Sequence, residues 1–223
     1  MKITKEGIAV IEGDNYLSND IIQAGRLDVA RDFLLQFKEY IPVGGVVADV
    51  GACLGDFTAT FSEFVGPSGR VYAFEPNLPV VDCLYHNMRP YLYWNVVIYS
   101  SALGARNGMA DIITDHNNIG ASRLVDGNGP LHVWALDNTA GSWQRLDFMK
   151  LDTEGWEPHV LAGGKETIMR LRPVMLIEIN PWMLGKQNFT PEDIYSRLDA
   201  LEYSFPRFDG PHGDILCIPK ERD

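Results

Sequence analysis

The chain has 223 residues, of which 46% are hydrophobic and 22% are charged, and its formal net charge is −11. This length suits a single α/β domain with a sizeable core, so we expect one domain over residues 1–223. The acidic balance disfavours a nucleic-acid partner, because an acidic surface repels phosphate backbones.

The sequence also bears on the compartment and on the membrane. No apolar run approaches the length of a membrane span, and residues 1–14 lack the apolar region of a signal peptide. The three cysteines are far apart and show no C-x-x-C spacing, so neither a disulfide framework nor a zinc site is predicted. We therefore expect a reduced, cytoplasmic protein with no membrane partner.

Residues 1–41 are expected to form an N-terminal arm and a helix. Glycines among β-branched residues predict a short hairpin or arm within residues 1–19. Apolar residues spaced three and four apart predict an amphipathic helix over residues 20–41, interrupted near Gly25 and ending before Pro42. This helix either forms a lid over a ligand site or only covers one face of a sheet.

The stretch Val46–Phe57, written VVADVGACLGDF, predicts a buried strand, a glycine turn and the start of a helix. Gly51 and Gly55 permit a sharp turn and a close approach of a ligand to the backbone. Such a unit places backbone N–H groups and a helix N-terminus beside a ligand. The spacing G-x-x-x-G differs from the G-x-G-x-x-G of dinucleotide-binding folds, so a pyrophosphate is not the expected ligand.

The next predicted strand, residues 70–75, ends in a carboxylate, Glu75. An acid at this point of a doubly wound sheet binds ribose hydroxyls. Asp49, near the glycine turn, can accept hydrogen bonds from an ammonium group. A ribose and an amino-acid ammonium together describe S-adenosylmethionine better than NAD. The alternative interpretation is that the glycines only shape a turn and that Glu75 is simply exposed.

Strands and helices continue to alternate along the chain, which predicts a mostly parallel α/β sheet with right-handed crossovers. Further strands are expected at residues 96–101, 146–152 and 174–179, helices at about 55–65, 80–88 and 190–201, and a closing hairpin at 203–208 and 215–218. Residues 104–137 break the alternation with many glycines and short β-like pieces at 110–114 and 132–136. We expect them to form an antiparallel insertion or an irregular loop near the active site.

Charged residues occur where two buried strands end. Lys150, Asp152 and Glu154 alternate and share one face if the chain stays extended, and Glu178 interrupts another apolar strand. Buried charges are costly unless they are paired or used. Three interpretations stay open: a divalent cation such as Mg²⁺ held by Asp152, Glu178 and Asn180, a base formed by Asp152 or Glu178 with Lys150 neutralising charge, or a structural Lys150–Glu178 ion pair.

Five segments, taken in order, resemble the FkbM-type methyltransferases: DVGACLG, VYAFEPN, SALG, MKLDTEGWE and LIEI. That family comprises S-adenosylmethionine-dependent O-methyltransferases with a Rossmann-like class I fold. The resemblance covers about residues 44–180. It implies a mostly parallel seven-stranded sheet in the order 3-2-1-4-5-7-6 with an antiparallel last strand.

The resemblance also implies roles for residues of these segments. Gly51 and Gly55 would frame the methionine part of the cofactor together with Asp49, Glu75 would bind the ribose, and Asp152 would lie near the sulfonium. The remaining cofactor contacts are expected from the same segments: Ala52, Cys53, Pro76, Asn77, Ser101 and Ala102. Two positions depart from the family pattern, because Cys53 replaces a usual Asn and Trp156 replaces a usual Ala. The second departure suggests a narrowed or aromatic-walled acceptor site.

Together these features predict an S-adenosylmethionine-dependent O-methyltransferase acting on a hydroxyl of a small molecule or glycan. The candidate catalytic residues are Lys150, Asp152, Glu154 and Glu178. Three alternatives stay open: an NAD-binding oxidoreductase, a non-catalytic S-adenosylmethionine-binding scaffold, and an RNA ribose methyltransferase. The RNA ribose methyltransferase is suggested by the combination of Lys150, Asp152 and Glu178. The excess of acidic over basic residues in the chain argues against it.

Overall fold

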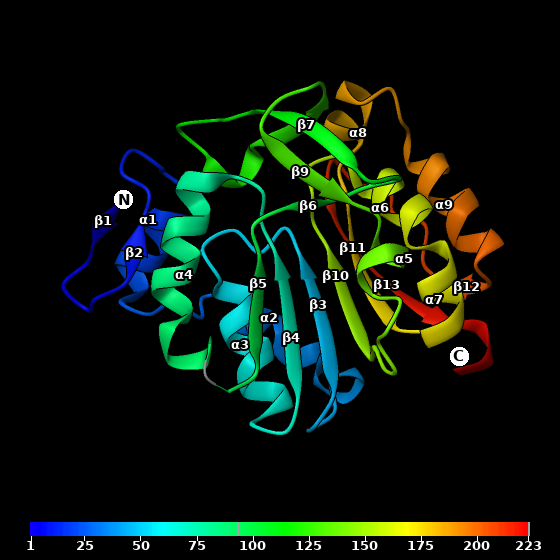
Figure 1. Cartoon of the computed structure of the whole chain (residues 1–223), viewed down its shortest axis with the longest axis horizontal. Helices are drawn as coiled ribbons and strands as arrows, with labels where there is room; N and C mark the ends of the chain where they lie inside the picture. The colour runs from blue at the N-terminus through cyan, green and yellow to red at the C-terminus, as the bar shows by residue number, and fades with distance from the viewer. Residues whose placement is uncertain (93, 223) are drawn as a thin grey trace.

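The computed structural model describes residues 1–92 and 94–222 (Figure 1). The strands of its central sheet are β3 (Val46–Val50), β4 (Arg70–Phe74), β5 (Val96–Tyr99), β10 (Phe148–Leu151), β11 (Val174–Ile179), β12 (Tyr203–Ser204) and β13 (Gly213–Pro219). The helices around it are α3 (Asp56–Val65), α4 (Leu78–Leu92), α5 (Leu136–Thr139), α6 (Glu157–Gly163), α7 (Lys165–Leu171), α8 (Pro181–Lys186) and α9 (Pro191–Ala200).

The central sheet has the order β12-β13-β11-β10-β3-β4-β5. Read from β5 and numbered along the chain, this order is 3-2-1-4-5-7-6. The strands from β11 to β5 are parallel to their neighbours, whereas β13 is antiparallel to β11 and β12. The predicted α/β class with a Rossmann-like central sheet is confirmed.

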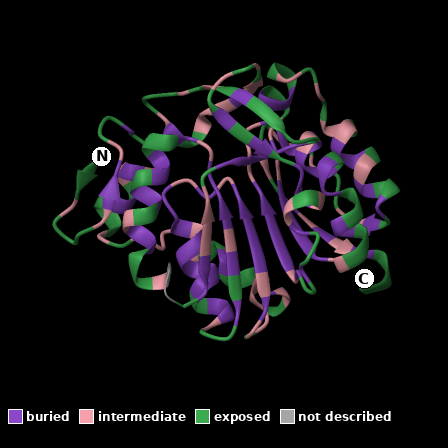
Figure 2. Ribbon diagram, in the orientation of Figure 1, coloured by how far each residue is buried: buried purple, intermediate pink, exposed green. Residues whose placement is uncertain are grey.

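Helices cover both faces of this sheet, and the central strands are almost entirely buried (Figure 2). Successive side chains of a strand point to opposite faces. Val47 and Phe148 accordingly pack with α3 and α4, while Ala48 and Met149 pack in the core beneath α6, α7 and α9. Lys150 shares the face of Phe148, which directs its side chain toward α3.

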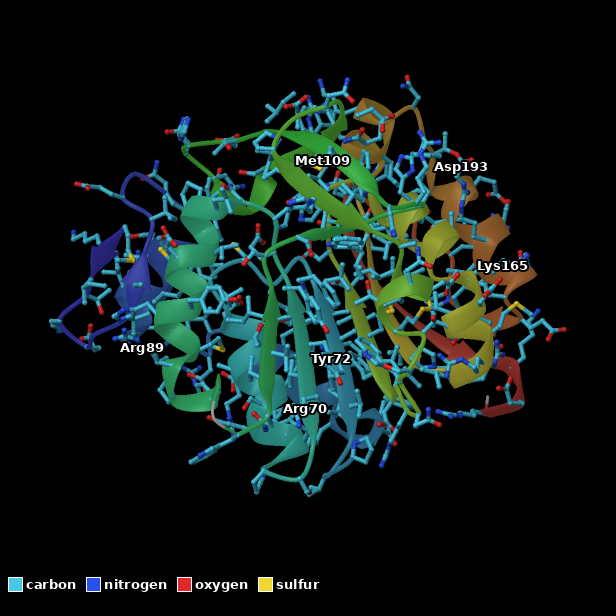
Figure 3. All side chains as sticks on the ribbon, viewed as in Figure 1. Arg70, Tyr72, Arg89, Met109, Lys165 and Asp193 are labelled. Atoms are coloured by element: carbon cyan, nitrogen blue, oxygen red, sulfur yellow. The ribbon has the colours of Figure 1, made fainter. Side chains whose placement is uncertain are left out.

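A second, smaller sheet lies over the carboxyl ends of β3, β4 and β10 (Figure 1). It contains β6 (Ala102–Leu103), β7 (Gly108–Ile113), β8 (Arg123–Asp126) and β9 (Leu131–Trp134), in the order β6-β9-β7-β8. Its β7 strand is antiparallel to β8 and β9. Figure 3 shows Met109 in this sheet, Arg70 at the opposite, amino end of β4, and Tyr72 in the middle of β4. The segment expected at 104–137 is therefore an ordered sheet that begins at Ala102.

The N-terminal arm contains an antiparallel pair, β1 (Lys2–Ile3) with β2 (Ala9–Val10), followed by α1 (Leu17–Ala24). The predicted interruption near Gly25 is confirmed, but the bounds of the predicted helix, residues 20–41, are wrong, because the first helix begins at Leu17 and a non-helical stretch follows it. Gly25 adopts a left-handed conformation with φ of 65° and ends α1, as C-terminal glycines commonly do. The chain resumes in α2 (Arg31–Leu34) and a 3₁₀ helix, Leu35–Tyr40.

Candidate functional site

A cavity of about 230 Å³ lies between the carboxyl ends of β3, β4 and β10 and the small sheet. Val50 and Phe74, which end β3 and β4, contribute to its floor, and Ile112 and Leu124 reach it from the small sheet. Leu17, at the start of α1, lines it from the arm. The wall residues from the arm and the small sheet were not predicted individually, although the segment 104–137 was expected near the site.

The predicted glycine turn forms one corner of this cavity. Gly51 has a φ of 87°, and a Cβ at this position would collide with the backbone carbonyl oxygen of Asp152. Gly55 has a φ of 94°, and a Cβ there would approach Leu84 and Met88 to 2.9 Å. Glycine at both positions thus lets β3 end tightly against β10 and lets α3 begin close to α4.

Glu75 lines the cavity next to this turn, with only 8% of its surface exposed. Its Oε2 accepts the backbone N–H of Cys53 at 3.1 Å, and its Oε1 accepts that of Asn77 at 2.8 Å. Burial raises the pKa of Glu75 to about 7, despite these two hydrogen bonds. Each carboxylate oxygen keeps a second lone pair, so the group can still accept two hydroxyl hydrogen bonds from a ribose.

Several buried polar atoms around this corner have no hydrogen-bond partner among the described residues: Asp49 Oδ1, Asn77 Nδ2 and Ser101 Oγ. Buried polar atoms in native proteins are almost always paired, and of these three residues Asn77 lines the cavity, so its unpaired Nδ2 points to a polar ligand there. A molecule with ribose hydroxyls, an adenine and an ammonium group offers suitable partners. The residues present therefore fit S-adenosylmethionine.

Lys150 lies at the bottom of the cavity beneath Phe57, whose ring centroid is 4.3 Å from Nζ. Its Nζ donates to Asp152 Oδ2 at 2.9 Å. Burial lowers the pKa of Lys150, but attraction to Asp152 and Asp49 outweighs burial and places it above its ordinary value. The alternative of a Lys150–Glu178 ion pair is wrong, because Lys150 pairs with Asp152 on its own strand end.

Asp152, Glu154 and Glu178 come together, each offering a carboxylate oxygen within 4.8 Å of the other two. Glu154 lines the cavity and Glu178 lies outside its wall. Burial and repulsion from Asp152 raise the pKa of Glu154 to about 8 and that of Glu178 to about 10. The three oxygens could hold a divalent cation. Asn180 does not join them, since its side chain accepts the backbone N–H of Met183 and caps α8.

The turn after β10 is held by Glu157, a residue that the sequence did not single out. Glu157 Oε1 accepts the backbone N–H of Thr153 at 2.8 Å, the Thr153 hydroxyl at 2.9 Å and the N–H of Gly155 at 3.3 Å. The side chain is 1% exposed, and burial raises its pKa to about 7. The sequence signal that could have identified Glu157 is an acid directly before a proline, Pro158, a pair that is typical of the start of a helix.

The predicted site residues divide into two groups. Those that line the cavity are Gly51, Cys53, Glu75, Pro76, Asn77, Ala102, Lys150, Asp152 and Glu154. Those that lie behind its wall are Asp49, Ala52, Gly55, Ser101 and Glu178. Asp49 accepts the Thr58 hydroxyl at 2.6 Å and is fully buried under the β3 end, where its charge acts on Lys150. Trp156 lies outside this cavity and lines another one.

The comparison with protein families now adds to this geometry. The profile described as the methyltransferase FkbM domain matches residues 49–205. The chain belongs to the FkbM methyltransferase family. It is an S-adenosylmethionine-dependent methyltransferase, which replaces the alternatives of an NAD-binding oxidoreductase and of a scaffold without catalysis.

Similar proteins agree with this assignment. The 2-O-methyltransferase NoeI of Sinorhizobium fredii (strain NBRC 101917 / NGR234) is 25% identical over 195 residues, covering 77% of this chain and 78% of NoeI. The methyltransferase FkbM of Methylobacillus flagellatus KT has a TM-score of 0.53 at 17% identity over 78% of this chain. The chain spans only 43% of that solved protein.

A third similar protein was solved with the cofactor. Fibrillarin of Aeropyrum pernix, with natively bound S-adenosyl-L-methionine, has a TM-score of 0.51 at 15% identity, covering 80% of this chain and 68% of that chain. At this identity the likeness shows the fold alone. In the present chain, none of the helices in the described residues is long and apolar enough to cross a membrane.

Proposed function

We propose that this methyltransferase transfers the methyl group of S-adenosylmethionine to a hydroxyl of a small molecule or glycan. One observation supports the proposal: a single cavity joins Glu75, the carboxylate predicted to bind the ribose, to the acidic turn after β10, where Glu154 keeps a buried Oε2 with no partner among the described residues. A hydroxyl needs such an acceptor for its proton. The similarity to NoeI, a 2-O-methyltransferase, also supports an oxygen acceptor.

S-Adenosylmethionine supplies an electrophilic methyl group when it is bound. The chain contributes the binding and the alignment. Glu75 would hold the ribose hydroxyls, and the amide of Asn77, which lines the same cavity, is placed to bind a polar atom of the nucleoside. Fixing both reactants in one chamber converts an encounter in solution into an aligned displacement.

Glu154 is our candidate for the base that takes the proton of the acceptor hydroxyl. It lines the cavity from a left-handed turn position, with a φ of 56°. Asp152 has a different role, because its ion pair with Lys150 fixes its orientation and leaves it as a hydrogen-bond acceptor that positions the hydroxyl. Glu154 in its ionised form would take the hydroxyl proton on Oε2, and the acceptor oxygen would receive the methyl group that S-adenosylmethionine supplies, leaving S-adenosylhomocysteine.

A small acceptor is favoured over a nucleic acid. The acids at the end of β10 and the net charge of −11 repel phosphate backbones. The cavity is also roofed by Leu17, Ile112 and Leu124, which exclude water and limit the size of what enters.

The test is an acceptor screen with the purified protein and S-adenosylmethionine. The panel contains methyl glycosides, phenols, other alcohols, primary amines and a short RNA. Release of S-adenosylhomocysteine is measured by mass spectrometry, and the methylated atom is located by NMR. We expect transfer to oxygen in a neutral alcohol or sugar, and strongly reduced transfer by Glu154→Gln with cofactor binding unchanged. Transfer only to nitrogen, or only to RNA, would refute the proposal.

A further inference from the structure

A second cavity, of about 720 Å³, opens at the other end of the small sheet. It lies where β7 begins and β8 ends, and α6 closes it from the side of the central sheet. Met109, labelled in Figure 3, lies on its rim. This cavity shares no wall residue with the cofactor cavity, although the turn after β10 contributes Glu154 to one and Trp156 to the other.

The polar groups of this cavity are not explained by the fold. Trp156 is 4% exposed, and its indole Nε1 is buried with no hydrogen-bond partner among the described residues. A buried indole N–H normally finds an acceptor. Trp156 lines the cavity, as does Ala105, the neighbour of the Gly104 that lies near this nitrogen, so a ligand bound against this wall would supply that acceptor.

The surrounding side chains define the chemistry of that ligand. Arg106 contributes donors, Asp126 contributes acceptors, and His159 stacks against Trp156 with ring centroids 4.1 Å apart. Burial lowers the pKa of His159, so near neutral pH its ring is uncharged and offers one donor and one acceptor. One cation and one anion balance each other, which suits an uncharged ligand with hydroxyls that both donate and accept.

We propose that this second cavity binds a sugar unit of an oligosaccharide acceptor, next to the unit that is methylated. The inference rests on the proposed function, because it assumes a glycan hydroxyl as the acceptor. The turn Asp152–Trp156 carries the proton acceptor Glu154 and the indole donor two residues later. An acceptor with two or more sugar units can therefore contact both sides of this one turn.

The test compares Trp156→Phe with Trp134→Phe. The first substitution keeps an aromatic ring and removes the N–H, whereas Trp134 lies partly exposed on β9 and lines neither cavity. Binding of neutral mono-, di- and trisaccharides is measured by saturation-transfer NMR, which does not require turnover. S-Adenosylmethionine affinity and thermal unfolding are measured for each variant.

We expect Trp156→Phe to weaken di- or trisaccharide binding by about threefold to tenfold, the effect of one hydrogen bond, and to leave monosaccharide methylation unchanged. Arg106→Ala, an exposed change that spares the core, should act in the same direction. Trp134→Phe should bind as the wild type does.

Two results would overturn the proposal. Unchanged oligosaccharide binding in both Trp156→Phe and Arg106→Ala would remove the cavity from acceptor recognition. Methylation of monosaccharides without any preference for longer sugars would also refute it, while leaving the proposed function intact. Absence of binding and of methylation for every sugar, with S-adenosylmethionine still bound, would instead refute the glycan acceptor and this inference together.

Discussion

Replacing Glu75 with Gln removes a negative charge from the cofactor site and leaves the volume of the side chain almost unchanged. In the wild type each carboxylate oxygen accepts one backbone N–H, from Cys53 and from Asn77. A Gln side chain has only one such oxygen, so its NH₂ group must face one of these N–H donors. One buried donor is then unpaired, which costs about 1–3 kcal/mol.

The same substitution removes an anionic acceptor from the ribose. Hydrogen bonds to charged groups contribute about 1.5–3 kcal/mol, which corresponds to a loss of affinity of about 10-fold to 100-fold. We therefore expect Glu75→Gln to bind S-adenosylmethionine at least about tenfold more weakly and to unfold at a lower urea concentration.

Isothermal titration and urea unfolding measure the two effects separately. The matched control is Asp82→Asn, which removes one carboxylate from the exposed face of α4. We expect the control to bind the cofactor as the wild type does. If Glu75→Gln stays folded and binds S-adenosylmethionine with wild-type affinity, the assignment of the ribose to Glu75 is wrong.

Three further predictions concern protons, the buried lysine and metal. Because the pKa of Glu75 is about 7, the ionised fraction of this carboxyl falls from about nine-tenths at about pH 8 to about one-tenth at about pH 6. Titration calorimetry should therefore show about tenfold weaker S-adenosylmethionine binding at the lower pH. An affinity that does not change with pH would contradict the role of Glu75. Lys150→Met should lower the free energy of unfolding by about 1–3 kcal/mol in urea titrations, because it leaves the partly exposed Asp152 without its buried partner. An unchanged free energy of unfolding would mean that the ion pair is dispensable. Chelation by EDTA should leave methyl transfer unchanged, and loss of activity that Mg²⁺ restores would instead assign the cation to Asp152, Glu154 and Glu178.

The sequence predicted the central sheet well because its signals are local. The apolar runs that become β3, β10 and β11 are buried on both faces, and a continuous apolar run is typical of a parallel strand. The glycine turn and Glu75 were found for the same reason, since turn chemistry and an acid at a strand end are visible within a few residues.

The acceptor side of the site depended on contacts that the sequence does not show. Alternation of Lys150, Asp152 and Glu154 assumes an extended chain, but β10 ends at Leu151 and Glu154 has a positive φ. The sequence therefore left the partner of Lys150 open, and Glu154 rather than Asn180 joined the group of acids. The second cavity likewise depends on Arg106, Asp126 and His159 meeting across three separate segments.

The roof of the cofactor cavity is assembled from parts that are distant in sequence, and Asp14 connects them. Its Oδ2 accepts the backbone N–H of Ser18 at 2.8 Å, and its Oδ1 accepts that of Ile119 at 3.2 Å. One carboxylate thus fixes the first turn of α1 to the 3₁₀ helix that follows β7.

Leu17 and Ile119, which flank these two bonds, both line the cavity. Their apolar side chains meet there only while the arm and the small sheet stay joined. The cofactor cradle is held by the sheet itself, whereas the enclosure of the reacting atoms depends on the junction of the arm and the small sheet, where Asp14 acts together with the hydrogen bond from Asn15 N–H to Asn117 O at 2.8 Å. Loss of Asp14 should consequently impair methyl transfer more than cofactor binding, because enclosure aligns the acceptor and excludes water while Glu75 remains in place.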